Sequence, residues 1–258
     1  MYSDKRPLRK VGHIPALIHR TYHSNIVNQH MYKDAYQSWI KLNQNYTTIW
    51  NTLNQCEKDM EKMGERYFKA WRRLIPLAYK ADLWRSCKLY NEGGIYIDAY
   101  TKPHMSLDDI IHLTGLKNEE HVFIATQDLK GIHNGFIITT PKHPFMKQYI
   151  EDMVHNIEYG KEDVLLTMTG PLCLEKSIQK VINKPNYKFK LGLNHQTYKF
   201  YLFHFNFGIY QYIDDNHKII LQKKYDFFHC YLYNYIYRFL AGTNYTYSYF
   251  TGKLVYDN

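Results

Sequence analysis

The chain has 258 residues, of which 45% are hydrophobic and 22% are charged. This balance excludes a wholly disordered chain and predicts a globular protein with a sizeable core. The formal net charge is +9, but the sequence contains no run of five or more Lys or Arg residues. A solvated basic surface is therefore favoured over a dedicated polyanion site.

Tyrosine is unusually frequent at 26 copies. Together with many Lys, Asn and Ile residues, it is typical of an AT-rich genome, such as that of a large DNA virus or a low-GC bacterium. The four cysteines form no CxxC pair, which disfavours a zinc site or a disulfide framework and indicates a reducing compartment. We find no signal-peptide pattern and no apolar stretch of roughly 18 residues. A soluble protein of the cytoplasm, or of the host cytoplasm if viral, is expected, and its oligomeric state stays open.

Hydrophobic periodicity and turn residues predict alternating strands and helices. In chain order, we expect a strand at 13–19, a helix at 30–42, a strand at 46–50, one or two exposed helices within 52–74, a helix at 77–90, strands at 95–98, 122–126 and 135–140, and helices at 144–157 and 171–182. This alternation indicates an α/β fold with a central, mostly parallel sheet flanked by helices.

From about residue 198 the chain becomes dense in aromatic residues. We expect two hairpin strands around a turn at 214–216, followed by an aromatic tail that closes over the domain. No repeat and no linker is apparent, so the sequence predicts one domain over 1–258. Its core is expected at 13–185 and a divergent C-terminal region at 186–258.

Three charged residues are the strongest candidates for a site. Asp82 and Arg85 are three positions apart on the expected helix, so their side chains share one face; alone, they are most simply a surface ion pair. Asp98 ends the expected strand, where ligands bind in open α/β sheets, and it suits a divalent cation with substrate phosphates. Alternatively, the Asp98 carboxylate caps the turn that follows it. Because the helix leads through Gly93 and Gly94 into this strand, all three groups are expected to border one cleft.

Other candidates are weaker. The end of the first strand carries Ile18, His19, Arg20, Thr21 and Tyr22. An aromatic side chain there could stack on a base, although His19 fits a buried histidine equally well. Asn134 lies in the sequence HNG, and Gly170 precedes a helix whose N-terminal N–H groups suit an anion. A turn without a ligand explains either of these as well.

Two motifs together resemble a known family. The sequence IPALIHRTY at 14–22 resembles the opening of the DXD-motif sugar transferases, glycosyltransferase family 32, which includes yeast initiating mannosyltransferases and bacterial capsular enzymes. The sequences ADLWR at 81–85, LY at 89–90 and GGIYID at 93–98 resemble its sugar-binding signature in order and spacing. The resemblance is strong over 13–105, loose to about 180 and nearly absent beyond.

The resemblance implies a GT-A-type fold and transfer of a hexosyl group from a UDP- or GDP-sugar, with retention, to a hydroxyl of a glycan, protein or lipid acceptor. It implies that 18–22 hold the nucleotide, that Asp82 and Arg85 bind the sugar, and that Asp98 serves the diphosphate and Mn²⁺ (or Mg²⁺). The remaining expected donor-binding residues are Gly93, Gly94, Tyr100, Asn134 and Gly170. The acceptor is expected to meet region 186–258.

The chain departs from the family at Tyr100, which stands where the second motif aspartate is expected. Either Asp98 binds the metal with help from diphosphate, water and another side chain, or metal dependence is weakened and Lys102 or Arg20 partly neutralises the leaving group. A degenerate protein that only binds nucleotide or glycan is the alternative function. A nucleic-acid-binding protein is disfavoured because the charge is dispersed and no recognition motif occurs.

Overall fold

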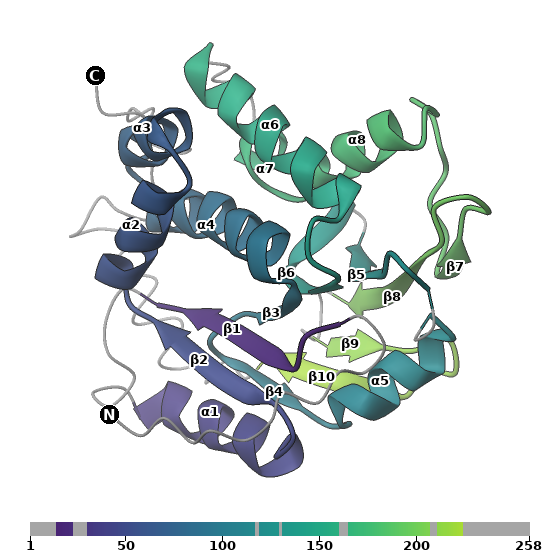
Figure 1. The fold of residues 1–258 in the computed structure, drawn as a ribbon. Helices are drawn as coiled ribbons and strands as arrows, with labels where there is room; N and C mark the ends of the chain where they lie inside the picture. Colours follow the sequence, from purple (N-terminus) through teal and green to yellow (C-terminus); the bar gives the residue numbers. More distant parts are fainter. Residues whose placement is uncertain are drawn as a thin grey trace.

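The computed structural model describes residues 14–22, 30–116, 119–128, 131–159, 165–206 and 211–223. Figure 1 shows the arrangement of its helices and strands. The strands are β1 (Leu17–Thr21), β2 (Thr47–Asn51), β3 (Gly94–Ile97), β4 (Thr101–Pro103), β5 (Phe123–Asp128), β6 (Gly131–Thr139), β7 (Gly192–Asn194), β8 (Phe200–Asn206), β9 (Gln211–Ile213) and β10 (Ile219–Lys223). The helices are α1 (His30–Leu42), α2 (Leu53–Lys62), α3 (Glu65–Arg73), α4 (Leu77–Glu92), α5 (Leu107–Thr114), α6 (Pro144–Glu158), α7 (Leu165–Met168) and α8 (Pro171–Val181).

The predicted α/β class, with helices flanking a central sheet, is confirmed. Each predicted helix and strand is present, with ends that differ by a few residues. The structure adds five elements that the sequence pattern did not reveal, namely β4, α5, α7, β7 and β8. The expected hairpin is formed by β9 and β10, and the Asp214 carboxylate accepts hydrogen bonds from two backbone N–H groups in its turn. The expected aromatic tail lies outside the described residues.

The strands form one 10-stranded sheet in the order β2-β1-β3-β6-β5-β8-β9-β10-β4, with β7 paired to β8. Parallel pairing joins β1 to β2 and β3, and β5 to β8. The other pairs of described strands are antiparallel, so the sheet is more mixed than the sequence predicted. One reason is that β5 and β6 follow each other too closely for the long crossover that parallel strands need. Since β8 pairs with β5, the sheet also continues across the expected boundary at 185.

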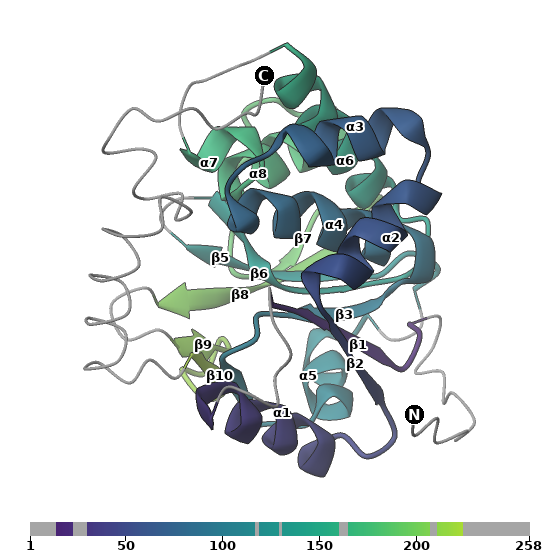
Figure 2. The same ribbon diagram turned by 90° about the vertical axis from the view of Figure 1, so that its left-hand side faces the viewer.

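Helices cover both faces of the sheet. Figure 2 shows α2, α3, α4, α6, α7 and α8 on one side, with α1 and α5 on the other. The side chains of β3 alternate between the two resulting cores: Tyr96 belongs to one, whereas Ile95 and Ile97 belong to the other. No helix of the described part of the chain is both long and apolar enough to cross a bilayer.

The turn after β3 links distant parts of this sheet. Strands β3 and β4 are consecutive in the chain, yet β4 pairs with β10 at the far end of the strand order. Arg20, which is fully buried, holds this turn: its Nη2 donates to the carbonyl oxygens of Asp98 (3.1 Å), Ala99 and Thr101 (3.3 Å). The backbone that carries Asp98 is therefore fixed from β1.

Candidate functional site

The connection between α4 and β3 depends on two glycines. Gly93 and Gly94 have φ values of +65° and +90°, which side-chain-bearing residues rarely adopt. A Cβ on Gly93 would lie 2.6 Å from Pro141, and one on Gly94 would lie 2.6 Å from the Leu17 carbonyl oxygen. In this structure the two predicted donor-binding glycines thus make the tight passage from helix to strand.

Asp82, Arg85, Asp98 and Asn134 come together in space. With Tyr96, His133, Tyr149, Thr169 and Lys223 they form what we call the buried polar cluster. It lies where α4, β6, the turn after β3, the start of α8 and the end of β10 meet. The two carboxylates and the arginine, which were expected to border one cleft, therefore lie close together in the interior of the protein.

Asp82 is held from three elements. Its Oδ1 accepts from Asn134 Nδ2 at 3.0 Å and lies 3.2 Å from Arg85 Nη2, and its Oδ2 accepts from the Thr169 hydroxyl at 2.9 Å. Burial raises the pKa of Asp82 to about 6, against the opposing effects of Arg85 and Thr169. A carboxylate has about four acceptor positions, so Asp82 retains the capacity to accept a hydrogen bond from a ligand hydroxyl.

Arg85 joins the two carboxylates. Its Nη1 donates to the Asn134 carbonyl oxygen at 2.8 Å and lies 3.6 Å from Asp98 Oδ1. The guanidinium carbon lies 4.2 Å from the centre of the Tyr96 ring. The ion pair that the sequence left as a surface feature is thus buried, since the side chains of Asp82 and Arg85 are 11% and 8% exposed.

Asp98 meets a lysine from the far end of the described chain. Its Oδ2 lies 2.9 Å from Lys223 Nζ, and its Oδ1 accepts a long hydrogen bond of 3.3 Å from the Tyr96 hydroxyl. Burial alone would raise the pKa of Asp98, but the positive charges of Lys223 and Arg85 outweigh it and lower this pKa to about 2. Asp98 is therefore an ionised carboxylate at neutral pH.

Gly135 leaves room for this arrangement. The Asp98 N–H donates to its carbonyl oxygen at 3.0 Å, so β6 runs directly beside the turn. A Cβ on Gly135 would lie 2.5 Å from both Asp98 Oδ2 and His133 Cε1. In the sequence HNG at 133–135, His133 and Asn134 thus belong to the buried polar cluster, and Gly135 leaves the space that the cluster needs.

Residues 18–22 have more varied positions. Ile18 packs in the core, and His19 Nε2 lies 3.2 Å from the Gly93 carbonyl oxygen in a fully buried position. Burial, opposed by nearby Glu92, lowers the pKa of His19 to about 4, which agrees with a neutral buried histidine. The Thr21 hydroxyl donates to the Asn51 carbonyl oxygen at 3.0 Å.

Four partly buried aromatic residues surround Ala99 beside the same turn. This aromatic cluster consists of Tyr22, Tyr36, Trp50 and Tyr100. The rings of Tyr36 and Trp50 meet edge to face, with centroids 6.0 Å apart. Tyr22 and Tyr100, both predicted donor-binding residues, thus share one patch next to Asp98.

The acidic groups of the described residues do not fit a divalent ion held by the protein. No group of three or more His, Cys, Asp or Glu residues suited to a metal occurs in the described ranges. Mg²⁺ and similar hard cations need several oxygen ligands, but Tyr100 replaces the second aspartate and an ammonium lies against Asp98 Oδ2. This ammonium, Nζ of Lys223, also lies 5.2 Å from the centre of the Tyr100 ring.

The sequence TGP at 169–171 contacts the buried polar cluster through its threonine. Gly170 is the N-cap residue of α8, and Pro171 begins the helix. The preceding residue, Thr169, donates its hydroxyl hydrogen to Asp82 and accepts at its carbonyl oxygen from Tyr149. The predicted helix start therefore borders the buried polar cluster.

Sequence reasoning missed Tyr149 and Lys223. Tyr149 also accepts from Asn134 Nδ2 at 3.0 Å, but its position on α6 is that of an ordinary core residue. Lys223 is paired in register with Thr101 of β4. This pairing joins distant parts of the chain and cannot be predicted from a local sequence pattern. Only knowledge of the strand order would have placed it beside Asp98.

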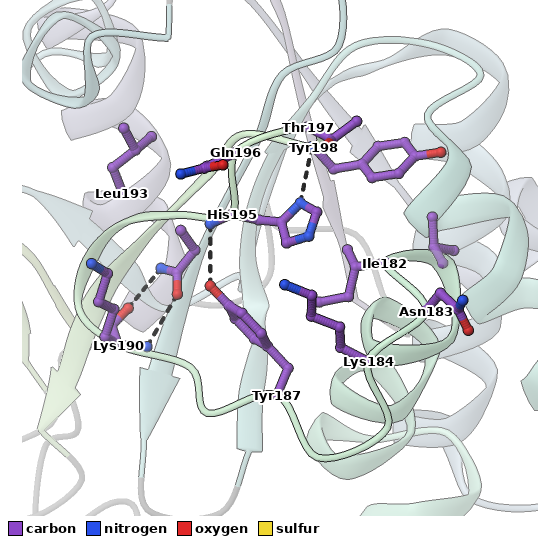
Figure 3. Close-up of a pocket in the computed structure, with 12 residues that line it drawn as sticks. Ile182, Asn183, Lys184, Tyr187, Lys190, Leu193, His195, Gln196, Thr197 and Tyr198 are labelled. Carbon is purple, nitrogen blue, oxygen red and sulfur yellow. Dashed lines mark hydrogen bonds between the residues drawn. The ribbon is translucent and has the colours of Figure 1, made fainter.

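A separate cavity lies between the end of α8 and the loops around β7 (Figure 3). It has a volume of about 800 Å³, and its lining includes Lys184, Tyr187, His195 and Tyr198. The Tyr187 hydroxyl accepts from the His195 backbone N–H at 3.1 Å. Its lining residues are distinct from those of the buried polar cluster.

Comparison with known proteins gives a consistent picture. Residues 29–116 match the family model described as "Glycosyltransferase sugar-binding region containing DXD motif". The chain is 26% identical over 161 residues to mannosyl phosphorylinositol ceramide synthase CSH1 of Saccharomyces cerevisiae, covering 62% of this chain and 41% of that protein. It is 27% identical over 179 residues to inositol phosphoceramide mannosyltransferase 2 of Schizosaccharomyces pombe, covering 67% and 49%. The chain thus spans less than half the length of these curated relatives.

Solved structures show a more distant likeness. The PaToxG glycosyltransferase has 17% identity and a TM-score of 0.44, over 66% of this chain and 70% of its own. The UDP-bound glycosyltransferase domain of the YGT toxin has 13% identity and a TM-score of 0.35, over 52% and 50%. Likenesses of this size decide nothing about the site. The family match and the curated relatives agree with the resemblance seen in the sequence, because residues 29–116 match the model of the DXD-motif glycosyltransferase sugar-binding region.

Proposed function

We propose that the protein is a glycosyltransferase of GT-A type that moves a hexosyl group from a UDP- or GDP-sugar to an acceptor hydroxyl, with retention. The observation that carries this proposal is the meeting of Asp82, Arg85 and Asp98 in one buried polar cluster. All three lie within the segment that matches the sugar-binding region.

Asp82 and Arg85, with Asn134, are the proposed sugar contacts. The hydrogen bonds that Asn134 Nδ2 and the Thr169 hydroxyl donate to Asp82 orient its carboxylate before a ligand arrives. Such preorganisation holds the anomeric carbon near the acceptor and lowers the entropic part of the barrier. The negative charge of Asp82 also favours the positive charge that develops on the sugar ring.

The diphosphate is proposed to lie near Asp98 and the cationic groups around it. As the bond to the anomeric carbon breaks, negative charge grows on the departing phosphate oxygen. That oxygen takes the proton of the acceptor hydroxyl as the new bond forms on the same face. This front-side route gives retention and needs no covalent nucleophile from the protein.

The nucleotide base is proposed to stack on the aromatic cluster. Tyr22, Trp50 and Tyr100 are partly buried aromatics beside the turn that carries Asp98. A base has a π-face, and stacking on an aromatic side chain is worth about 1–3 kcal/mol. This position would let one donor molecule extend from the aromatic cluster to Asp82.

The names of the relatives suggest which sugar to test first. One is named a mannosyl phosphorylinositol ceramide synthase and the other an inositol phosphoceramide mannosyltransferase. We propose a mannosyl donor and an inositol-containing lipid as the first candidates for donor and acceptor. Other glycans and proteins remain in the acceptor screen.

The test is a panel of UDP- and GDP-sugars, each with and without Mn²⁺ or Mg²⁺, in which release of nucleoside diphosphate is measured. Turnover of one donor, accelerated by its acceptor, supports the proposal. Nucleotide binding that is indifferent to metal, with no turnover of any donor, would instead identify the degenerate binding protein that Tyr100 motivates. Neither binding nor turnover would reject both functions.

A further inference from the structure

We infer that Lys223 supplies the positive charge that binds the donor diphosphate, in the position where the DXD motif would otherwise hold a divalent ion. This inference rests on the proposed function and deepens it. It assigns a binding residue outside the matched segment 29–116, on the last described strand.

The strand register brings Lys223 to Asp98. Lys223 pairs with Thr101 on β4, which follows the Asp98 turn directly. Its Nζ lies 2.9 Å from Asp98 Oδ2, and its side chain is only 6% exposed. The lysine is therefore built into the polar cluster and is not a surface charge that happens to point toward it.

A lysine at this position can do part of what a metal ion does. An ammonium has three N–H donors, so it can bridge a carboxylate oxygen and phosphate oxygens at once. A diphosphate placed beside the ionised Asp98 would otherwise meet like-charge repulsion. Lys223 and Arg85 both contact Asp98, and their two positive charges offset this repulsion.

His133 favours a further partner for Lys223. The Gly135 N–H lies against His133 Nδ1 at 3.2 Å, and Lys223 Nζ lies 3.3 Å from His133 Nε2. Burial, assisted by the charge of Lys223, holds the pKa of His133 well below its usual value, so the ring is neutral. A neutral imidazole has one acceptor nitrogen, so the ring cannot accept from both of these donors. A phosphate oxygen accepts hydrogen bonds whichever tautomer His133 adopts, so it can bind the Lys223 ammonium without this competition.

The two cations expected from the sequence are placed less well for this role. Lys102 points toward Asp34 on α1, with Nζ 3.5 Å from its Oδ2. Arg20 Nη2 is engaged by the backbone carbonyls of the turn. The geometry therefore favours Lys223 as the neutralising group.

The test is calorimetric titration of UDP and GDP into the full chain, in EDTA and in Mn²⁺. The variants are Lys223→Met, which removes the charge, and Lys223→Arg, which keeps it. Lys180→Met is the matched control, because Lys180 also pairs with an aspartate but at the surface, 2.6 Å from Asp152. Circular dichroism checks that each variant folds. If Lys223→Met does not fold, Asp98→Asn is compared with the double variant Asp98→Asn, Lys223→Met.

We expect the wild type to bind one nucleotide in EDTA, with Mn²⁺ changing Kd by less than about threefold. Loss of a charge-assisted hydrogen bond should weaken binding about 10- to 100-fold in Lys223→Met, and less in Lys223→Arg. Lys180→Met should bind like the wild type. Binding that requires Mn²⁺ and is unchanged in Lys223→Met would overturn the inference and leave the glycosyltransferase proposal standing. Absence of nucleotide binding and of donor turnover in every buffer would reject both.

Discussion

Arg85 Nη1 lies 3.6 Å from Asp98 Oδ1, and this contact joins helix α4 to the turn after β3. The same guanidinium lies 3.2 Å from Asp82 Oδ1. Two carboxylates therefore share one buried arginine, which sets their separation and offsets their repulsion. Changes at any of the three should be felt at the other two.

Arg85→Lys should damage both the site and the fold. A lysine lacks the fork that reaches Asp82 and the Asn134 carbonyl oxygen together. We expect the free energy of unfolding to fall by about 1–3 kcal/mol and donor turnover to fall sharply. Urea unfolding and nucleotide release are the measurements. Arg66→Lys, at a half-exposed pair with Glu158, should change stability by less than about 0.5 kcal/mol. Equal effects of the two substitutions would contradict a special role for Arg85.

Gly135→Ala should disturb the space between Asp98 and His133. The new methyl group would lie 2.5 Å from atoms of both residues, so one side chain must move. We expect donor turnover and nucleotide affinity to fall together with stability. Gly115→Ala is the control, because Gly115 has a φ of +71° but open space around it. Backbone strain should lower the free energy of unfolding of that variant by about 1 kcal/mol, while its nucleotide affinity stays constant. If Gly135→Ala binds nucleotide normally, the steric account is wrong.

The pH profile should report on Asp82. Its pKa is raised to about 6 by burial, so the carboxylate loses its charge as pH falls from 7 to 5. Turnover should therefore fall over this interval, with a midpoint near 6, if the ionised form holds the sugar. The free energy of unfolding should change in the opposite direction to turnover. The folded state binds the proton of Asp82 more tightly than the unfolded state does. Asp82 therefore adds stability as pH falls from about 6 toward 3.8, the ordinary pKa of an aspartate. In Asp82→Asn the residual activity should lack this step. A profile that is the same in both proteins would exclude Asp82 as its source.

Tyr22→Leu should separate base binding from diphosphate binding. Loss of stacking should weaken binding of the preferred nucleoside diphosphate by about 1–3 kcal/mol. Affinity for inorganic pyrophosphate, measured by competition, should stay constant because this ligand has no base. Tyr187→Leu, in the separate cavity, serves as the control. A parallel loss for both ligands would argue against stacking on the aromatic cluster.

The central elements were predictable because their signals are local. Pro76 before α4, the two glycines after it and the apolar run of β3 fix the order of helix, turn and strand. This order suffices to bring Asp82, Arg85 and Asp98 near one another. The downstream sequence HNG could be recognised as a candidate, but its contact with Asp82 follows from the antiparallel pairing of β6 with β3.

The other half of the buried polar cluster required tertiary information. Lys223 reaches Asp98 only because β10 pairs with β4, and the sequence gives no local sign of that pairing. The role of Arg20 was also beyond a local pattern: a basic residue at a strand end suits a phosphate, whereas its Nη2 holds three carbonyl oxygens of a turn. The mixed sheet escaped prediction because apolar strands look alike in either direction.

The most direct test of the account compares donor turnover by the wild type and Asp98→Asn, using the sugar donor selected from the panel. Asn keeps the shape of the side chain but removes the charge that pairs with Lys223 and Arg85. Asp34→Asn, at an exposed pair with Lys102, is the control and should be unchanged. We predict that Asp98→Asn folds and loses turnover by about 100-fold or more. Undiminished turnover in that variant would contradict the placement of the reaction at this cluster.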